Sequence, residues 1–199
     1  MKLPNWIPFI ADRGTNPDKT RSMRDLGAVE IGRLSEAVGN LSESSWSDAD
    51  SDKPNQFSVL GKTQHMVFRF ILDFQTHRNH ADTPLWAEWK ELIQPILDET
   101  ARRLGLEQPE FPRVMLARLR PGGIIAEHVD GAPAALWPHK VHVPLATNRE
   151  ATFRVGRTQR HLKAGRVTEV NNNRRHSARN DGDTDRLHLI FECYDAKAE

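Results

Sequence analysis

The chain has 199 residues, and its 28 lysines and arginines nearly balance its 27 aspartates and glutamates, for a net charge of +1. That length favours a single domain with one core, and the charge balance gives no reason to expect a nucleic acid, a membrane surface or a strongly acidic partner. One cysteine, Cys193, excludes an internal disulfide and a cysteine-built metal cluster, and the lack of a long apolar run or secretion signal favours a cytoplasmic protein.

The first third of the chain predicts an arm, one helix and a loop. Residues 1–20 mix prolines with a few large apolar residues, which is typical of an extended arm that packs on a domain. Residues 21–41 repeat apolar side chains at helical intervals and predict one helix, although three glycines weaken it. Residues 42–56 are polar and rich in turn formers, and they predict a loop. This loop is either a plain surface loop or a cover over an active-site mouth.

Two stronger elements follow. Residues 65–74 form the longest β-prone apolar run of the first half and predict a central strand. Residues 85–104 form an amphipathic pattern with apolar side chains at three- and four-residue steps, which predicts a helix that Gly105 can end. Pro95 lies inside this pattern, and we expect it to kink the helix or to split it in two.

The second half predicts a series of strands joined by short turns. Helices first and many strands later favour a mainly β protein with flanking helices, a double-stranded β-helix or jelly-roll barrel of the cupin type with N-terminal helices against one sheet. We expect residues 1–110 to form an N-terminal extension and residues 111–199 the catalytic core of one structural domain. The predicted strands are residues 113–120, 124–130, 139–147, 151–156, 166–170 and 186–194.

Polar side chains alternate with apolar ones on three of these segments. His128 and Asp130 lie two residues apart, so on a strand both point to one face at a Cα separation of about 7 Å and can converge on one ion. An imidazole and a carboxylate are two of the three ligands of the facial triad of non-haem iron(II). Lys140 and His142 likewise share one face of their strand.

A further histidine and an arginine complete the pattern. His176 lies in a polar, turn-rich stretch, and ten residues later a strand begins with Arg186 and His188 on one face. We expect these polar faces to point into the barrel, where a buried Arg186 without an anion would be costly, so the interior calls for a carboxylate ligand. Plainer readings of each residue remain open at this point: a surface pair for His128 and Asp130, a loop histidine for His176, and an ion pair of Arg186 with Asp183 or Asp185.

Four short motifs occur in a fixed order over residues 111–195, and as a set they resemble the aspartyl/asparaginyl β-hydroxylase family of iron(II)- and 2-oxoglutarate-dependent dioxygenases, which includes bacterial proline hydroxylases. The motifs are Arg120-Pro-Gly-Gly before His128-Val-Asp130, Lys140-Val-His142-Val-Pro-Leu, His176-Ser-Ala-Arg-Asn180 and Arg186-Leu-His-Leu-Ile.

The resemblance implies an enzyme with iron(II) and 2-oxoglutarate as cofactors. Its iron ligands are then His128, Asp130 and His176, and a guanidinium fork at Arg186 matches the distal carboxylate of 2-oxoglutarate. His142 lies near the co-substrate, with Lys140 in place of an arginine that relatives often have. The presence of a carboxylate ligand favours hydroxylation over halogenation.

The resemblance also implies the class of substrate, which is a free amino acid or an Asp/Asn-type residue in a peptide, hydroxylated at an unactivated carbon. Candidate substrate-binding residues are Arg118, Arg120, Arg174 and His188. Two other functions stay open, a cupin-like metal-dependent isomerase or epimerase and a non-enzymatic binding barrel. The sequence also leaves open a homodimer built on the N-terminal helices.

Overall fold

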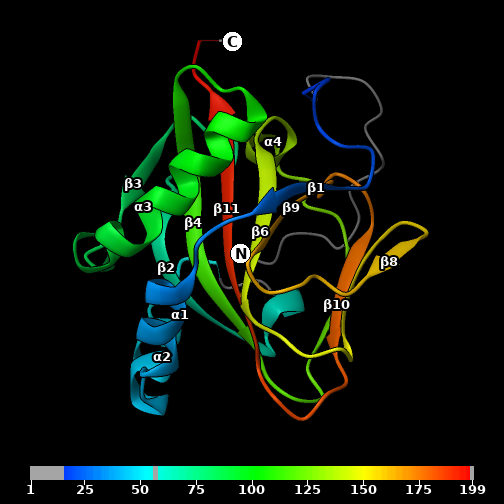
Figure 1. Cartoon of the computed structure of the whole chain (residues 1–199). Helices are drawn as coiled ribbons and strands as arrows, with labels where there is room; N and C mark the ends of the chain where they lie inside the picture. The colour runs from blue at the N-terminus through cyan, green and yellow to red at the C-terminus, as the bar shows by residue number, and fades with distance from the viewer. Residues whose placement is uncertain (1–15, 56–57, 198–199) are drawn as a thin grey trace.

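The computed structural model describes residues 16–55 and 58–197, and in it strands from both halves of the chain form two antiparallel sheets (Figure 1). The larger sheet has seven strands in the order β1-β9-β6-β11-β4-β2-β3, and the smaller sheet has four in the order β5-β10-β7-β8. The strands of the larger sheet are β1 (Met23–Ala28), β2 (Thr63–Ile71), β3 (His80–Asp82), β4 (Pro109–Leu119), β6 (His139–Ala146), β9 (Arg166–Val170) and β11 (Arg186–Asp195). Those of the smaller sheet are β5 (Ile124–His128), β7 (Ala151–Val155), β8 (Thr158–Arg160) and β10 (His176–Asn180).

Three helices cover the outer face of the larger sheet (Figure 1). They are α1 (Gly32–Gly39), α2 (Glu43–Ser51) and α3 (Leu85–Leu104), and a short α4 (Pro133–Leu136) follows β5. Apolar side chains of the helices, such as Leu34 and Leu97, form one buried cluster with Val141 and Val143 of β6 and with their neighbours on β11. This arrangement confirms the jelly-roll prediction. Among the described residues, no helix is both long and apolar enough to cross a membrane.

The space between the two sheets holds the polar faces that the sequence predicted. His142 lies on β6 between the apolar Val141 and Val143, and its ring contacts the Phe153 ring of the smaller sheet with centroids 4.9 Å apart. Apolar residues of both sheets, including Leu119, Phe153 and Ala178, form a second buried cluster there. Side-chain alternation therefore separates a helix-facing apolar core from a polar interior.

Several predicted elements differ from the structure. The prediction of one helix at residues 21–41 is wrong over the stretch that forms strand β1, which precedes helix α1. Gly27 lies within β1 with a φ of 98°, where the register of β1 with β9 shifts between Asp25 and Gly27. The prediction of a loop at residues 42–56 is wrong over the stretch that forms α2. Ser42 caps that helix by accepting a hydrogen bond from the Ser45 N–H at 3.0 Å. Trp46 is the residue of the helix whose side chain is buried. Polar composition here marks an exposed helix rather than a loop.

Other elements follow the predictions closely. Helix α3 has the predicted bounds, and Gly105 ends it in a left-handed conformation with φ of 76°. Pro95 lies within it but does not split it. The predicted strand at residues 65–74 is β2, which pairs with β4 on one side and β3 on the other. Most of the predicted arm at residues 1–20 lies outside the described residues. The polar stretch at residues 171–180 begins with a turn and continues as strand β10 from His176.

Candidate metal centre and anion site

Three predicted metal ligands meet at the edge of the smaller sheet. Strand β5 ends at His128 and β10 begins at His176, and the two residues are direct cross-strand partners with ring centroids 4.2 Å apart. Asp130 follows β5 and is held by its backbone N–H, which donates to the Asn172 carbonyl at 3.0 Å. One ligand atom from each of the three side chains lies within 4.8 Å of the others. The fold thus brings together residues that are 48 positions apart in the sequence.

The donor atoms point at a common position. The Nε2 atoms of His128 and His176 lie 3.6 and 3.9 Å from Oδ1 of Asp130. Bonds of about 2.1 Å are usual for a divalent metal with such ligands, and adjacent donors of an octahedral ion then lie about 3 Å apart, so the three donors have to move closer together when an ion binds. Two imidazoles and a carboxylate on one side leave the opposite side of an octahedral ion open.

Hydrogen bonds set the tautomer of both histidines. Nδ1 of His128 lies 2.8 Å from the Ala126 carbonyl oxygen, and Nδ1 of His176 lies 2.9 Å from the Arg174 carbonyl oxygen. A carbonyl only accepts, so each Nδ1 carries the proton and each Nε2 keeps a lone pair for a metal. Burial is the main reason that the pKa of His176 falls to about 4, which keeps this ring neutral and able to bind a metal at neutral pH.

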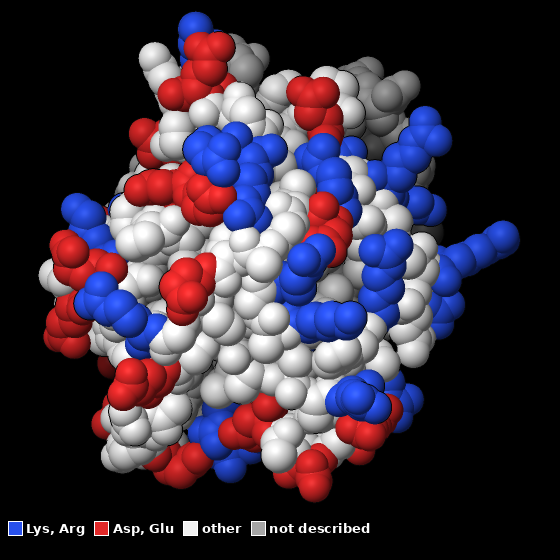
Figure 2. Space-filling model, in the orientation of Figure 1, with Lys and Arg blue, Asp and Glu red and all other residues white. Residues whose placement is uncertain are grey.

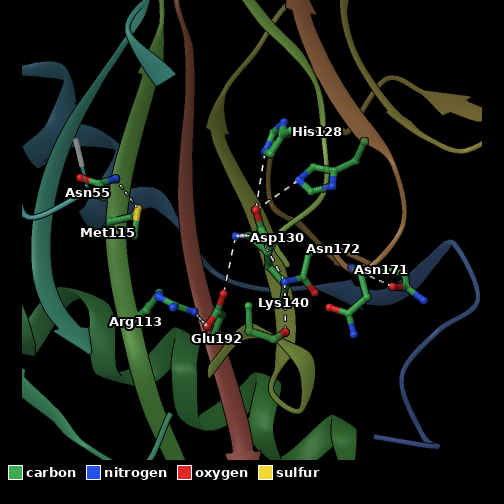
Figure 3. A network of polar contacts seen from close by, with 12 residues as sticks. Asn55, Arg113, Met115, His128, Asp130, Lys140, Asn171, Asn172 and Glu192 are labelled. Carbon is green, nitrogen blue, oxygen red and sulfur yellow. Dashed lines mark hydrogen bonds and ion pairs between the residues drawn. The ribbon is translucent and has the colours of Figure 1, made fainter. Parts of the chain in front are cut away.

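Asp130 is ionised in spite of its burial. Burial alone would raise the pKa of this carboxyl group, but the charge of Lys140 and, at the low pH at which the carboxyl group titrates, the charges of the two histidines outweigh it and hold the pKa well below its ordinary value. Lys140 donates to Oδ2 at 2.7 Å, and Asn172 donates to the same oxygen at 3.2 Å (Figure 3). The carboxylate is therefore negatively charged and directs its Oδ1 to the histidines, as a metal ligand would.

A second polar cluster, which we call the anion site, lies deeper between the sheets and consists of His142, Arg186 and His188. All three are at most 4% exposed. Nη2 of Arg186 lies 3.0 Å from Nδ1 of His188, and Nδ1 of His142 lies 3.4 Å from the same atom. Because the guanidinium can only donate, Nδ1 of His188 accepts and its Nε2 carries the proton.

The anion site lacks a partner of its own. Nη1 of Arg186 and the Nε2 atoms of His142 and His188 are buried without a hydrogen bond. Burial lowers the pKa of Arg186 to about 10, so the guanidinium stays charged at neutral pH. Burial and then the charge of Arg186 hold the pKa values of both histidines well below their ordinary range, so the rings are neutral. The site is a single buried positive charge with two unused donors, Nη1 of Arg186 and Nε2 of His188, which suits a carboxylate.

One aromatic ring links the two sites. The Phe153 ring centroid lies 6.0 Å from the Arg186 guanidinium carbon, 4.9 Å from the His142 ring and 6.1 Å from the His176 ring. The metal ligands and the anion site therefore lie against the same side chain. A molecule that bridges them has to be short, of the size of a small dicarboxylate.

Comparison with known proteins identifies the family. A family model for Aspartyl/Asparaginyl beta-hydroxylase matches residues 56–196, which is more than half of the chain. The chain belongs to this family. The enzymes of the family use iron(II) and 2-oxoglutarate, and the donor sets on the two sides of Phe153 suit a divalent ion and a carboxylate. No curated protein sequence matches the chain.

Solved structures share the fold at low identity. An oxidoreductase of the 2OG-Fe(II) oxygenase family from Burkholderia pseudomallei has a TM-score of 0.59 and 15% identity, over 82% of this chain and 77% of that one. The epimerase SnoN from nogalamycin biosynthesis has a TM-score of 0.56 and 15% identity over 88% and 78% of the two chains. A prolyl-4-hydroxylase from Pseudomonas putida has a TM-score of 0.51 and 10% identity over 88% and 94%. These identities support the fold alone.

The predicted substrate-binding residues of this family member are scattered. Arg118 on β4 is the cross-strand partner of Leu187, so it faces the helices, where it bonds Glu43 and Asp185, each at 2.6 Å. Arg120 contacts the same Glu43. Arg174 is exposed and donates to the Arg21 carbonyl at 2.9 Å. His188 is the only one of the four candidates that lies within the anion site.

Sequence reasoning missed three residues that shape the site. Phe153 carried no polar signal, and Glu192 follows the apolar run Leu189-Ile-Phe191 of its strand. Asn172 is fully buried beside Asp130, and the run of three asparagines directly ahead of His176 was a signal that could have marked it. Asp185 pairs with Arg118, and no carboxylate of the described residues forms an ion pair with Arg186. The alternative prediction of an Arg186–Asp185 ion pair is therefore wrong.

Charge is unevenly distributed over the surface. Between residues 149 and 179 nine arginines and lysines stand against two acidic residues, and one of these two, Glu169, is fully buried. Figure 2 shows many basic side chains on the side of the molecule where β8 and β10 lie, and mixed charges over the helices. This side includes the turn that carries Arg174 and Arg175 up to His176, so it favours the approach of anionic molecules.

Proposed function

We propose that the protein hydroxylates an unactivated C–H bond of a free amino acid or of an Asp/Asn-type residue in a peptide, with conversion of 2-oxoglutarate and dioxygen to succinate and carbon dioxide. The observation that carries this proposal is the pair of sites on Phe153: a three-ligand set with inward donors beside a buried arginine that lacks an anion. The basic side near His176 supports a substrate that carries a carboxylate.

Each side chain then has a defined task. His128, Asp130 and His176 hold iron(II), and Arg186 with the Nε2–H of His188 binds the distal carboxylate of 2-oxoglutarate. Phe153 shields the space between them from water. When bound, iron(II) and 2-oxoglutarate supply the activation of dioxygen and the removal of hydrogen from carbon. The carboxylate of Asp130 occupies the position that a halide needs in related halogenases, which favours hydroxylation.

The alternatives explain less. A cupin-like isomerase or a non-catalytic binding barrel has use for a metal or a cavity, but it leaves a buried Arg186 with two neutral histidines and no anion. An epimerase that also consumes 2-oxoglutarate uses the same two sites, and only the product separates it from a hydroxylase.

The test begins without oxygen. Metal-free protein mixed with iron(II) and 2-oxoglutarate should develop the weak visible charge-transfer band of a metal-bound 2-oxo acid, and His176→Ala should lack it. Succinate release in air should then identify the substrate from free amino acids and from peptides that contain Asp or Asn, and the mass of the product distinguishes an added oxygen atom from inversion. A folded protein with no band contradicts the proposal.

A further inference from the structure

The two oxygens of the Asp130 carboxylate have different partners. Oδ1 has Nε2 of His128 at 3.6 Å and Nε2 of His176 at 3.9 Å and accepts no hydrogen bond from the residues that the structure describes. Oδ2 accepts from Lys140 at 2.7 Å and from Asn172 at 3.2 Å. Both good donors are on the oxygen that faces away from the histidines, which fixes the rotation of the carboxylate.

Lys140 is held in place by charge pairs on the neighbouring strands. Its cross-strand partner on β11 is Glu192, with Nζ and Oε1 3.6 Å apart, and Glu192 is in turn bonded to Arg113 on β4. Figure 3 shows this row crossing below the metal ligands. Glu192 and Arg113 are buried and the Lys140 side chain is 20% exposed, so the charge pairs of this row lie largely away from water, where they constrain its geometry.

Asn172 holds Asp130 at two points. Its carbonyl accepts the Asp130 backbone N–H at 3.0 Å, and its side-chain Nδ2 donates to Oδ2 of Asp130 and to the Ala135 carbonyl at 3.3 Å. Asn172 is fully buried. It therefore connects the segment ahead of His176, the ligand Asp130 and the segment around α4.

We infer that Lys140 and Asn172 are positioning residues that keep Asp130 a one-oxygen ligand of the metal, and that Lys140 serves the metal centre rather than the co-substrate. This inference rests on the metal site of the proposed function but not on 2-oxoglutarate or on turnover. A carboxylate without these two donors is free to rotate and to bind with both oxygens, and the second oxygen takes a coordination position that the co-substrate or dioxygen needs.

The direction in which metal affinity changes when Lys140 is removed distinguishes a positioning role from simple charge balance. Lys140 is a cation close to the ion, so electrostatics alone predicts that its removal tightens the binding of a divalent metal. Loss of an outer hydrogen-bond partner instead weakens metal binding, by about 10–100-fold. The two explanations give opposite results for the same variant.

The experiment is a titration of metal-free protein with cobalt(II), followed by its visible absorption. Lys140→Met should weaken cobalt affinity by about 10–100-fold and lower the intensity of the cobalt bands, because a two-oxygen carboxylate raises the coordination number. Lys140→Arg keeps the positive charge and the hydrogen-bond donors, so it should retain most of the wild-type cobalt affinity and band intensity. Asn172→Leu, which removes the donor without removing a charge, should weaken affinity in the same direction.

The matched control is a second buried lysine in the same region. Lys19 is 9% exposed and donates to the carbonyls of Ala135 and Leu136 at 3.2 and 3.3 Å rather than to Asp130. Lys19→Met should leave cobalt affinity and spectrum unchanged. Circular dichroism confirms folding, and Asn172→Leu carries the test if Lys140→Met does not fold.

Unchanged or tighter cobalt binding in Lys140→Met overturns the inference, as does an equal loss in Lys19→Met. A wild-type protein that binds no cobalt contradicts the metal site itself. That result is distinct from a failure of the positioning role, in which the wild-type protein binds cobalt and the Lys140→Met variant binds it equally or more tightly.

Discussion

The metal ligands and the anion site are neighbours, but they differ in how their polar atoms are satisfied. At the metal ligands, the atoms that face away from the ion already have partners, which are backbone carbonyls for the two Nδ1 atoms and Lys140 and Asn172 for Oδ2 of Asp130. At the anion site, one atom of each member is buried without a partner. The first site is formed before its ion binds, whereas the second is complete only with a ligand.

This difference predicts how the protein responds to its cofactors. A site with orphaned buried donors destabilises the free protein, and a ligand that satisfies them stabilises the fold through its binding energy. We expect metal alone to shift the thermal midpoint less than 2-oxoglutarate does in the presence of metal. The variants below separate the two sites.

The largest effect is expected at the metal ligands. His176→Ala removes a ligand whose lone pair is already directed at the ion, so the loss of metal affinity should exceed the roughly 10–100-fold cost of losing an outer partner. The measurement is cobalt(II) titration together with succinate release. Full retention of metal binding in a folded His176→Ala protein would remove this residue from the site.

Arg186→Met should separate function from stability. Replacing an unpaired buried charge by an apolar side chain is often neutral or stabilising, so the metal-free variant should unfold at the same or a higher urea concentration than wild type. Its affinity for 2-oxoglutarate should fall by about 2 kcal/mol or more, roughly 30-fold, because the carboxylate loses a charged partner.

The control for this variant is metal affinity, which should stay unchanged because Arg186 contacts His188 and the Phe153 ring but none of the three metal ligands. The prediction fails if Arg186→Met strongly destabilises the metal-free protein, since that result would mean that the guanidinium already has an anionic partner within the fold.

The sequence predicted the anion site better than it predicted what surrounds it. Alternation of polar and apolar residues on β6 and β11 was enough to place His142, Arg186 and His188 in the interior, because a strand has only two faces. Helix α3 was predictable to the residue from its periodicity and from Gly105. Local pattern thus determines which residues face inward.

Tertiary partners were not predictable in the same way. Lys140 was placed with the co-substrate by resemblance, but which oxygen it reaches depends on the chain path after β5, which returns Asp130 to β6. Strand β1 was misjudged because its apolar side chains fit a helical spacing. Helix α2 was misjudged because its polar composition was read as a loop, while the cap at Ser42 and the buried side chain of Trp46 suffice for a surface helix. Contacts between distant segments decide these cases.

The anion site also predicts a pH effect on stability. The folded-state pKa of His188 lies well below the 6.5 of an unfolded chain, so between these values only the unfolded chain takes up the proton. The free energy of unfolding is therefore highest above about pH 6.5. It falls as the pH drops below that value, by about 1.4 kcal/mol per pH unit for each such histidine. Urea unfolding of metal-free protein at pH 7 and pH 5.5 measures it, and His188→Gln should reduce the difference by about 1.4 kcal/mol. An equal pH effect in wild type and His188→Gln would mean that His188 is protonated in the fold.

The smallest effect on function is expected for Arg118, on the face of the larger sheet that packs against the helices. Arg118 is the strand neighbour of Leu119, whose cross-strand partner is Arg186, but Arg118 points to the helices and lies over the Trp46 ring at 5.6 Å. Arg118→Ala should therefore cost about 1 kcal/mol of stability through lost contacts with α2 and leave the KM values for substrate and 2-oxoglutarate unchanged. Steady-state succinate release and urea unfolding measure both quantities. If KM for the substrate rises while stability is unchanged, Arg118 reaches the substrate, and the separation of the sheet into a catalytic face and a helix-packing face is wrong.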